Sequence, residues 1–184
     1  MIPYLCNMFT KIPNEALRRL DIESFKKAEK FPIIIVLDNI RSMQNIGSMF
    51  RTGDAFRVEE ILLCGITACP PHREIQRAAL DATESVSWQY FETTRQALEY
   101  LKSKGYTIYA VEQASPAVAL QDLRVSEGQK AAFVFGNEVD GVDERLFDLV
   151  DACIEIPQFG TKHSFNVAVS LGIVLWGLYE KWLR

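Results

Sequence analysis

Two continuous apolar runs, 33–37 and 131–135, place the strongest constraint on what this chain can fold into. Neither run alternates with polar residues, and this pattern is typical of parallel strands that are covered on both faces. The first run ends at Asp38-Asn39 and the second at Gly136. A buried strand that stops at a polar or glycine-flanked turn is how an α/β protein builds a ligand site.

The rest of the chain alternates between expected strands and helices. The apolar patterns predict strands at 60–64, 86–91, 106–111 and 152–156, and helices at 45–56, 72–81, 94–104, 143–149 and 165–183. Asn45 is a candidate cap for the first of these helices. We therefore expect an α/β domain with a mainly parallel sheet and helices on both faces.

Residues 1–31 have a different character and are expected to form an N-terminal helical extension to a domain that spans 32–184. Pro13-Asn14 is a candidate helix start, and Asp21 is a candidate cap for a second helix that ends near Lys30. Four apolar side chains of this extension are expected to pack against the body of the protein: Leu17, Leu20, Ile22 and Phe25.

The net charge of −4 argues mildly against a nucleic-acid binder, because such proteins usually carry a basic footprint. A local basic patch can still bind phosphate on an acidic protein. The candidates are Arg18, Arg19, Lys26, Lys27 and Lys30 in the extension, and Arg41, Arg51 and Arg57 in the domain. A solvated helix face explains the basic residues of the extension equally well.

The four cysteines form no CxxC pair and the chain has two histidines, so the sequence indicates neither a zinc site nor a disulfide framework. Reduced thiols predict a cytoplasmic protein, and no N-terminal segment resembles a leader peptide. The longest apolar tract lies within 167–179, which is shorter than the roughly 20 residues of a membrane span. We interpret it as a buried core or interface helix.

Three polar loops follow the expected strands, at 38–45, 136–141 and 157–166, and Arg51 lies in the helix after the first loop. No GxGxxG follows the first strand, which argues against a dinucleotide-binding domain. Val142-Asp143 stands where a phosphate loop needs Lys-Ser/Thr, and no GxSxG elbow of a hydrolase is present. The residues alone therefore indicate an α/β protein with a polar site at the strand ends.

These loops resemble the three signature motifs of the SpoU-type (TrmH-like) RNA ribose 2′-O-methyltransferases of the SPOUT superfamily. The matching segments are 45–56, 133–142, and 156–157 together with 164–170. The usual third motif reads Ser-Leu-Asn-Val-Ser, so Phe165 and Ala168 depart from it. The resemblance covers about 33–182.

The resemblance implies transfer of a methyl group from S-adenosyl-L-methionine to a ribose 2′-hydroxyl of tRNA or rRNA, with tRNA preferred. It also implies a C-terminal trefoil knot and a homodimer formed through the C-terminal helix, with Leu175 in the apolar stripe of the interface. The sulfonium methyl group is already activated, so no metal is expected. Two alternatives stay open: a catalytically inactive RNA- or cofactor-binding protein of the same fold, and a small-molecule methyltransferase or other nucleotide-binding α/β enzyme.

Arg51 resembles the catalytic arginine of the family. Because arginine is effectively never deprotonated in proteins, we favour a role in which Arg51 holds an RNA phosphate and positions the hydroxyl. The alternatives are an arginine that accepts a proton in a crowded cationic site, and a surface ion pair with Asp54.

The remaining catalytic candidates implied by the resemblance are Asn45, Glu138, Ser164 and Asn166. Glu138 is expected to orient Arg51 or an asparagine, to bind the ribose, or only to cap the following helix. For the two asparagines and Ser164, helix capping is the alternative to a functional role. The cofactor pocket is expected to use backbone and apolar groups at Val111, Gly136, Ile156 and Phe165.

Overall fold

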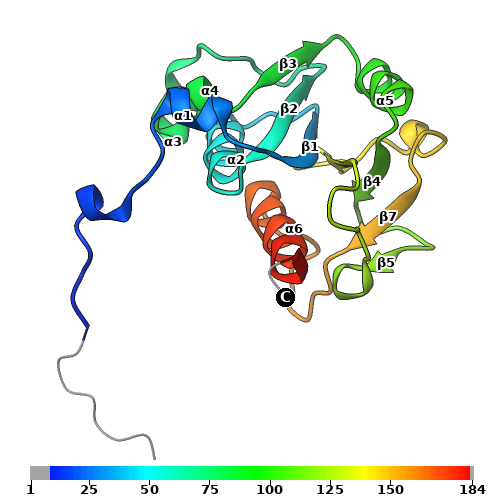
Figure 1. The fold of residues 1–184 in the computed structure, drawn as a ribbon. Helices are drawn as coiled ribbons and strands as arrows, with labels where there is room; N and C mark the ends of the chain where they lie inside the picture. Colours follow the sequence, from blue (N-terminus) through cyan, green and yellow to red (C-terminus); the bar gives the residue numbers. More distant parts are fainter. Residues whose placement is uncertain (1–8, 183–184) are drawn as a thin grey trace, which may run out of the picture.

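A computed structural model describes residues 9–182, which contain a seven-stranded sheet with helices on both faces (Figure 1). The strands are β1 (Phe31–Asp38), β2 (Val58–Cys64), β3 (Trp88–Phe91), β4 (Thr107–Val111), β5 (Val118–Ala119), β6 (Ala131–Phe135) and β7 (Ala152–Glu155). They lie in the order β3-β2-β1-β6-β4-β7-β5, and every pairing is parallel. The prediction of an α/β domain with a mainly parallel sheet is confirmed, although β5 was not expected.

The helices and 3₁₀ turns connect these strands. They are η1 (Asn14–Leu17), α1 (Ile22–Lys27), α2 (Met43–Ala55), α3 (Arg73–Ala79), α4 (Ala82–Ser85), α5 (Thr94–Ser103), η2 (Leu120–Asp122), η3 (Glu144–Leu146) and α6 (Val167–Trp182). The helix expected at 143–149 is reduced to the single turn η3, and the helix expected at 72–81 is divided into α3 and α4. The C-terminal helix begins at Val167 rather than Phe165, and Leu183 lies outside the described residues.

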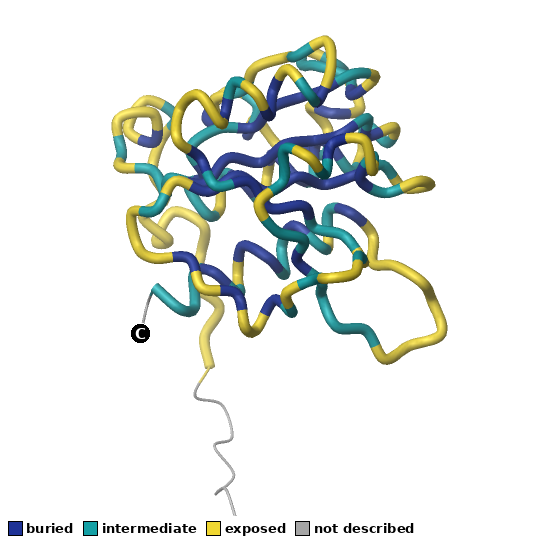
Figure 2. The backbone as a smooth tube through the Cα atoms, turned by 90° about the vertical axis from the view of Figure 1, so that its right-hand side faces the viewer, coloured by how far each residue is buried: buried dark blue, intermediate teal, exposed yellow. Residues whose placement is uncertain are grey.

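Strands β1 and β6 lie side by side in the interior of the sheet, which explains why both apolar runs lack polar residues. Ile33, Ile35 and Leu37 pack into one core cluster with side chains of α2, α3 and α6. Ile34 and Val36 point into the other cluster, with side chains of α5. Figure 2 shows the buried strands between exposed loops. Because each face of the strand is covered, a polar residue at any of these positions would lose its hydration.

The carboxyl end of β1 is fixed by a buried carboxylate. Asp38 is 1% exposed, and it accepts hydrogen bonds from the Asn39 side chain (2.8 Å), the Asp143 N–H (3.2 Å) and the Thr94 hydroxyl. These contacts join β1 to the start of α5 and to the turn that leads into η3. They hold the strand end, from which the first polar loop departs, against the rest of the domain.

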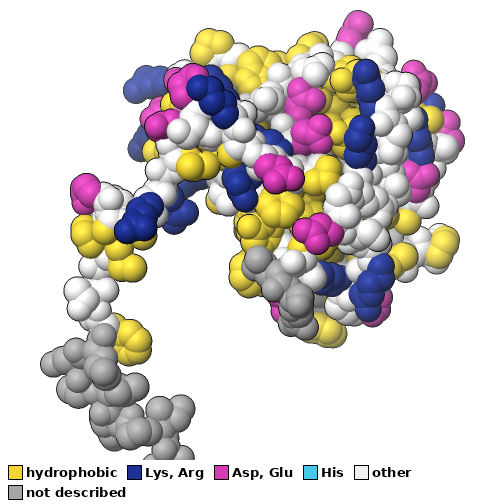
Figure 3. Space-filling model, in the orientation of Figure 1, with side chains coloured by type: hydrophobic (Ala, Val, Ile, Leu, Met, Phe, Trp, Pro, Cys, Tyr) yellow, Lys and Arg dark blue, Asp and Glu magenta, His cyan; other side chains and the backbone are white. Residues whose placement is uncertain are grey.

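The N-terminal segment 9–21 is exposed throughout, and its first part, up to η1, stands off from the body of the protein (Figures 1 and 3). Asp21 caps α1 as predicted, since its carboxylate accepts the Ser24 N–H at 2.7 Å. Phe25 is 5% exposed and packs into the core, but Leu17 and Leu20 are 39% and 52% exposed. The expectation that these two leucines pack against the core is therefore wrong, because only the short helix α1 reaches it.

Two further expectations about helices are also corrected. The cap of α2 is Ser42, whose hydroxyl accepts the Asn45 N–H at 3.2 Å, so Asn45 is not the cap. Leu175 is 2% exposed and packs into the core cluster of its own chain, so it does not belong to an exposed stripe. The exposed apolar side chains of α6 are Val169 and Trp176, which are 50% and 56% exposed.

Candidate functional site

The loop after β6 is a tight backbone structure that depends on two glycines. The N–H groups of Asn137 and Gly141 each bond the other residue's carbonyl at 3.1 Å, and the Asn137 side chain accepts the N–H groups of Val139 and Asp140. A Cβ on Gly136 would lie 1.9 Å from the Gly141 carbonyl carbon, and Gly141 itself has a φ of +72°. Only glycine allows this close approach and this left-handed conformation without strain.

Glu112, the residue after β4, holds the far side of the same loop. Its carboxylate accepts the Val142 N–H and the Gln113 N–H, each at 2.9 Å. A Cβ on Gly141 would lie 2.1 Å from a carboxylate oxygen of Glu112, so the two groups are in close contact. The sequence analysis did not identify Glu112. The signal that could have identified Glu112 is the position of a carboxylate directly after a buried strand.

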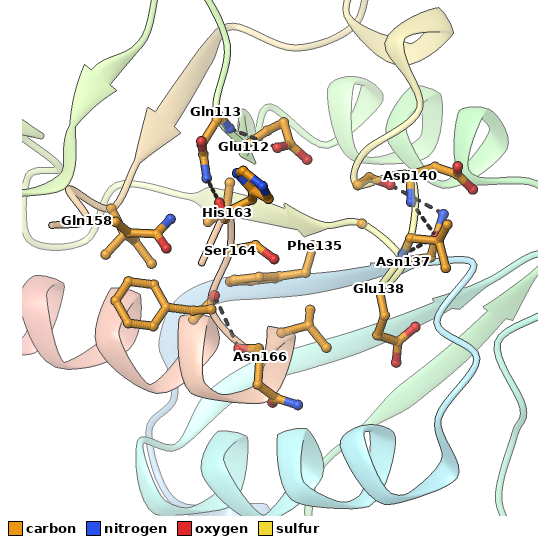
Figure 4. Close-up of a pocket in the computed structure, with 18 of the residues that line it drawn as sticks. Glu112, Gln113, Phe135, Asn137, Glu138, Asp140, Gln158, His163, Ser164 and Asn166 are labelled. Atoms are coloured by element: carbon orange, nitrogen blue, oxygen red, sulfur yellow. Dashed lines mark hydrogen bonds between the residues drawn. The ribbon is translucent and has the colours of Figure 1, made fainter. Parts of the chain in front are cut away.

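A cavity of about 530 Å³ opens where the ends of β4, β6 and β7 meet the start of α6, and we call it the strand-end cavity (Figure 4). Apolar side chains of Phe135 and Ile154 contribute to its wall. All four residues predicted to bind the cofactor line it: Val111, Gly136, Ile156 and Phe165. Its size lies within the range of small-molecule sites in proteins.

Three of the catalytic candidates form one hydrogen-bonded chain beside this cavity. The Asn166 side-chain amide donates to the Asn45 side-chain oxygen at 3.1 Å, and the Asn45 amide donates to the Glu138 carboxylate at 2.8 Å. Glu138 also accepts the N–H groups of Arg41 and Ser42, at 3.2 Å and 3.3 Å. The three polar loops, which lie far apart in the sequence, are thus joined through their side chains.

These contacts settle which partners Glu138 and Asn166 have within the described chain. Glu138 orients an asparagine, Asn45, rather than Arg51. Asn166 has a second contact, because its side-chain oxygen accepts the Ala168 N–H at 2.9 Å at the start of α6. Asn166 therefore fixes Asn45 and caps the last helix at the same time.

The hydrogen bonds also decide the charge of Glu138. Burial alone would raise the pKa of this carboxyl, but the bonds from Asn45 and from the backbone N–H groups of Arg41 and Ser42 outweigh burial and lower the pKa. Hydrogen bonds to the charged form favour ionisation. Glu138 is therefore an ionised acceptor at neutral pH and has no proton to donate.

The loop 157–166 supplies the remaining wall of the strand-end cavity. Ser164 and His163 both line the cavity, and the side chain of Gln113 donates a hydrogen bond to the His163 carbonyl (Figure 4). Ser164 is exposed and is not the cap of α6, since Asn166 has that role. Gln113 and His163 were not identified from the sequence, because no spacing or residue pattern distinguishes them.

Arg51 does not lie in the strand-end cavity. It lines a second cavity, of about 450 Å³, between the segment 17–25, the C-terminal half of α2, and the segment 79–85. Six residues along a helix advance about 9 Å and turn through about 600°, which leaves Asn45 and Arg51 about 120° apart around the axis of α2. The alternative role for Arg51, a surface ion pair with Asp54, is not seen among residues 9–182, where Asp54 instead accepts the Ser85 hydroxyl.

Residues 9–182 contain no group of three metal-ligating side chains. Within the same range, no helix is long and apolar enough to cross a membrane. Cys64, Cys69 and Cys153 are free thiols, and Cys6 lies outside the described residues.

The model of the SpoU rRNA methylase family matches residues 32–176. The chain belongs to this family. The match contains all three loops around the strand-end cavity and the helix that carries Arg51. The resemblance indicated by the three loops is therefore confirmed.

Two relatives with named activities are longer than this chain. The tRNA (guanosine(18)-2′-O)-methyltransferase TARBP1 of Mus musculus is 32% identical over 149 residues, which are 78% of this chain and 9% of that protein. The 23S rRNA (guanosine-2′-O-)-methyltransferase RlmB of Neisseria meningitidis is 30% identical over 145 residues, which are 78% of this chain and 56% of that protein. This chain thus spans a small part of the first relative and just over half of the second.

The fold is shared with solved structures of the SpoU family. The AdoMet-bound rRNA methyltransferase from Sinorhizobium meliloti superimposes with a TM-score of 0.77 at 24% identity. The superposition covers 87% of this chain and 61% of the other. At this level of identity the likeness supports the fold, and the chemistry has to be argued from the site itself.

Proposed function

We propose that this chain transfers the methyl group of S-adenosylmethionine to a ribose 2′-hydroxyl of RNA. The observation that carries the proposal is the Asn166–Asn45–Glu138 chain of hydrogen bonds at the edge of the strand-end cavity. A binding module would need the cavity alone, whereas this chain of bonds holds polar groups from all three loops in fixed positions next to it. The named activities of the mouse and Neisseria relatives agree with the proposal.

The strand-end cavity fits S-adenosylmethionine in size and lining. Its wall combines apolar side chains with the backbone of two glycine-containing loops, as a nucleoside with a polar ribose requires. Val111, Gly136, Ile156 and Phe165 are the groups that would hold the cofactor. When bound, the cofactor supplies an activated methyl group for transfer to an oxygen nucleophile.

The protein's own side chains then position the acceptor. Glu138 is ionised and fixes the Asn45 amide, and Asn166 fixes the Asn45 oxygen from the other side. Ser164 lies free at the cavity wall, and we assign it to the acceptor ribose. Holding a hydroxyl in line with a methyl donor is the kind of contribution that raises rate through proximity.

Arg51 has a place in this reaction if the protein works as a homodimer. It lines a different cavity from the one next to Asn45, so we infer that it serves the strand-end cavity of a second copy. There it binds an RNA phosphate with its planar guanidinium group and positions the adjoining ribose.

The surface of α6 supports a dimer through this helix. Val169, Gly172, Ile173 and Trp176 recur at the spacing of one helix face, and Val169 and Trp176 are at least half exposed. A stripe of this kind suits a self-complementary contact between two copies. The trefoil knot is part of the same proposal and rests on the family. The cytoplasmic location rests on the reduced cysteines, and tRNA is proposed ahead of rRNA as the substrate.

The proposal is tested by calorimetric titration of the protein with S-adenosylmethionine and with S-adenosylhomocysteine. We expect saturable binding of both, with one site per chain. Gly136→Ala should abolish binding, because the added Cβ would meet the Gly141 backbone at 1.9 Å. Gly160→Ala is the matched control, since nothing lies within 4 Å of its added Cβ. Absence of binding to the unaltered protein would refute the proposal.

A further inference from the structure

The cavity that contains Arg51 is built from three separate segments, each of which contributes arginine or aspartate side chains. Arg18 and Arg19 come from the N-terminal segment, and Arg51 and Arg57 come from α2 and the residues after it. The segment 79–85 completes the wall. We call this space, with a volume of about 450 Å³, the arginine cavity.

The carboxylates of the arginine cavity are largely engaged by other groups of the chain. Asp21 accepts the Ser24 N–H at 2.7 Å, and this bond to the backbone lowers the pKa of Asp21. Asp54 accepts the Ser85 hydroxyl. Asp81 is the third aspartate of the wall. Two of the three carboxylates therefore satisfy donors of their own chain.

The arginines are not engaged in the same way. Among residues 9–182, no hydrogen bond or ion pair involves the guanidinium group of Arg18, Arg19 or Arg51. Arg57 contacts the Phe31 ring at 5.9 Å. Lys30 lies close to the same wall and donates a hydrogen bond to the Ala28 carbonyl at 3.1 Å. The pKa of this lysine is lowered, mainly by burial and to a smaller extent by the positive charge of Arg57. The wall thus carries four arginines and three aspartates, and no ion pair joins them among residues 9–182.

The backbone of this wall turns sharply at several helix ends. Five described non-glycine residues have a positive φ, and four of them line the arginine cavity: Arg18, Arg57, Leu80 and Asp81. Arg18 and Leu80 end η1 and α3 in this conformation, which is common at helix C-termini.

We propose that the arginine cavity binds the phosphodiester backbone of the RNA substrate, with Arg18 and Arg19 of the N-terminal segment as its outer phosphate contacts. The inference rests on the proposed function and extends it to residues outside the family match, which begins at 32. Arginine forks match phosphate oxygens in pairs. Leu17, Leu20 and Leu80 line the same cavity and are exposed, which gives the sugars an apolar surface to pack against.

The geometry also explains how an acidic protein holds RNA. The net charge is −4, so the protein as a whole repels RNA and the attraction has to come from a local cluster of arginines. Arg51 lies at the inner wall of the arginine cavity, and Arg18 and Arg19 lie on the exposed segment that covers it. Backbone phosphates bound in this space would place an adjoining ribose next to Arg51.

The test compares two double variants of equal charge. Arg18→Gln/Arg19→Gln removes two cations that line the cavity, and Lys26→Gln/Lys27→Gln removes two cations of the neighbouring helix α1 that do not. The probe is fluorescein-labelled unfractionated tRNA, titrated in the presence of saturating S-adenosylhomocysteine at several salt concentrations. Circular dichroism and S-adenosylhomocysteine affinity verify that both variants are folded.

We expect the arginine variant to bind tRNA about tenfold or more weakly at low salt, with the slope of log K against log salt reduced by about 2. The lysine variant should stay within about twofold of the unaltered protein. Equal weakening of both variants, or no weakening of either, would overturn the inference while RNA methylation by the unaltered protein stands. If the unaltered protein bound S-adenosylhomocysteine but no RNA, the RNA part of the proposed function would fail as well, and a protein partner would become the occupant to test.

Discussion

Mixed dimers provide a sharp test of the place assigned to Arg51. One copy carries Arg51→Ala and keeps an intact strand-end cavity. The other copy carries Gly136→Ala and keeps Arg51. In the second copy, the new Cβ would lie 1.9 Å from a backbone carbon of Gly141, far below van der Waals contact, so the loop must be displaced. A displacement of about 1 Å at a positioned site costs roughly 10²-fold in rate, so both homodimers should be almost inactive.

The expected activity of the mixed dimer follows from counting sites. If Arg51 serves the cavity of the other copy, the mixed dimer has one site with an intact arginine and an intact cavity, and one site with neither. Its methyl transfer rate should therefore be about one half of that of the unaltered dimer. If Arg51 serves its own cavity, both sites of the mixed dimer are damaged and it should be as inactive as the homodimers.

The assay uses co-expression of two differently tagged copies and purification through both tags in sequence. Transfer of tritiated methyl groups from S-adenosylmethionine to bulk RNA is then measured per mole of dimer. A mixed dimer of Arg51→Ala with Gly160→Ala is the control, because nothing lies within 4 Å of a Cβ at Gly160. An inactive dimer of Arg51→Ala with Gly136→Ala, beside an active control, would refute the assignment of Arg51 to the second copy.

The other predictions concern the proposed interface on α6, the ionised carboxylate of Glu138, and Glu112, which holds the loop after β6. Trp176→Glu should give a folded monomer in sedimentation velocity, and an intact dimer of this variant would rule out α6 as the interface. Leu175→Glu should instead unfold the chain, because Leu175 is 2% exposed. The lowered pKa of Glu138 means that its contribution to stability is present above the ordinary glutamate pKa of about 4.3 and is lost as the pH falls through the lowered value. Urea unfolding should therefore show Glu138→Gln to be less stable than the unaltered protein at pH 7, with a smaller difference near pH 3; a difference that is constant with pH would contradict the bonding described. Glu112→Ala should weaken S-adenosylhomocysteine binding by at least tenfold in calorimetry, since two N–H groups of the cavity wall lose their acceptor, and an unchanged affinity would show that the loop holds its shape without it.

The main features of the fold were predictable because they depend on local pattern. The apolar run at 33–37 identified a strand covered on both faces, and its neighbours in the sheet followed from similar runs. β5 was missed because two residues carry no periodicity. Leu175 was assigned to the wrong side of α6, because nearly all of that helix is apolar and its pattern does not distinguish the core face from the exposed face.

The motifs pointed to residues that the structure brings together, but not to how they are arranged. The motifs indicated Asn45, Glu138 and Asn166, and the structure joins them by hydrogen bonds. Ser42 displaced Asn45 as the cap of α2, which leaves the Asn45 side chain available to Glu138. The separation of Arg51 from these residues depends on the rotation along α2 and on what packs around it, and motif spacing does not report either.

The measurement that tests the central claim most directly is methyl transfer from tritiated S-adenosylmethionine to bulk tRNA and rRNA, followed by alkaline hydrolysis. A 2′-O-methyl group blocks cleavage of the adjoining phosphodiester, so we expect the tritium in alkali-resistant dinucleotides. We also expect Arg51→Ala to lose this signal while it still binds S-adenosylhomocysteine within about a factor of three. Tritium in mononucleotides would show methylation of a base, and no incorporation into either RNA by a protein that binds the cofactor would contradict the account.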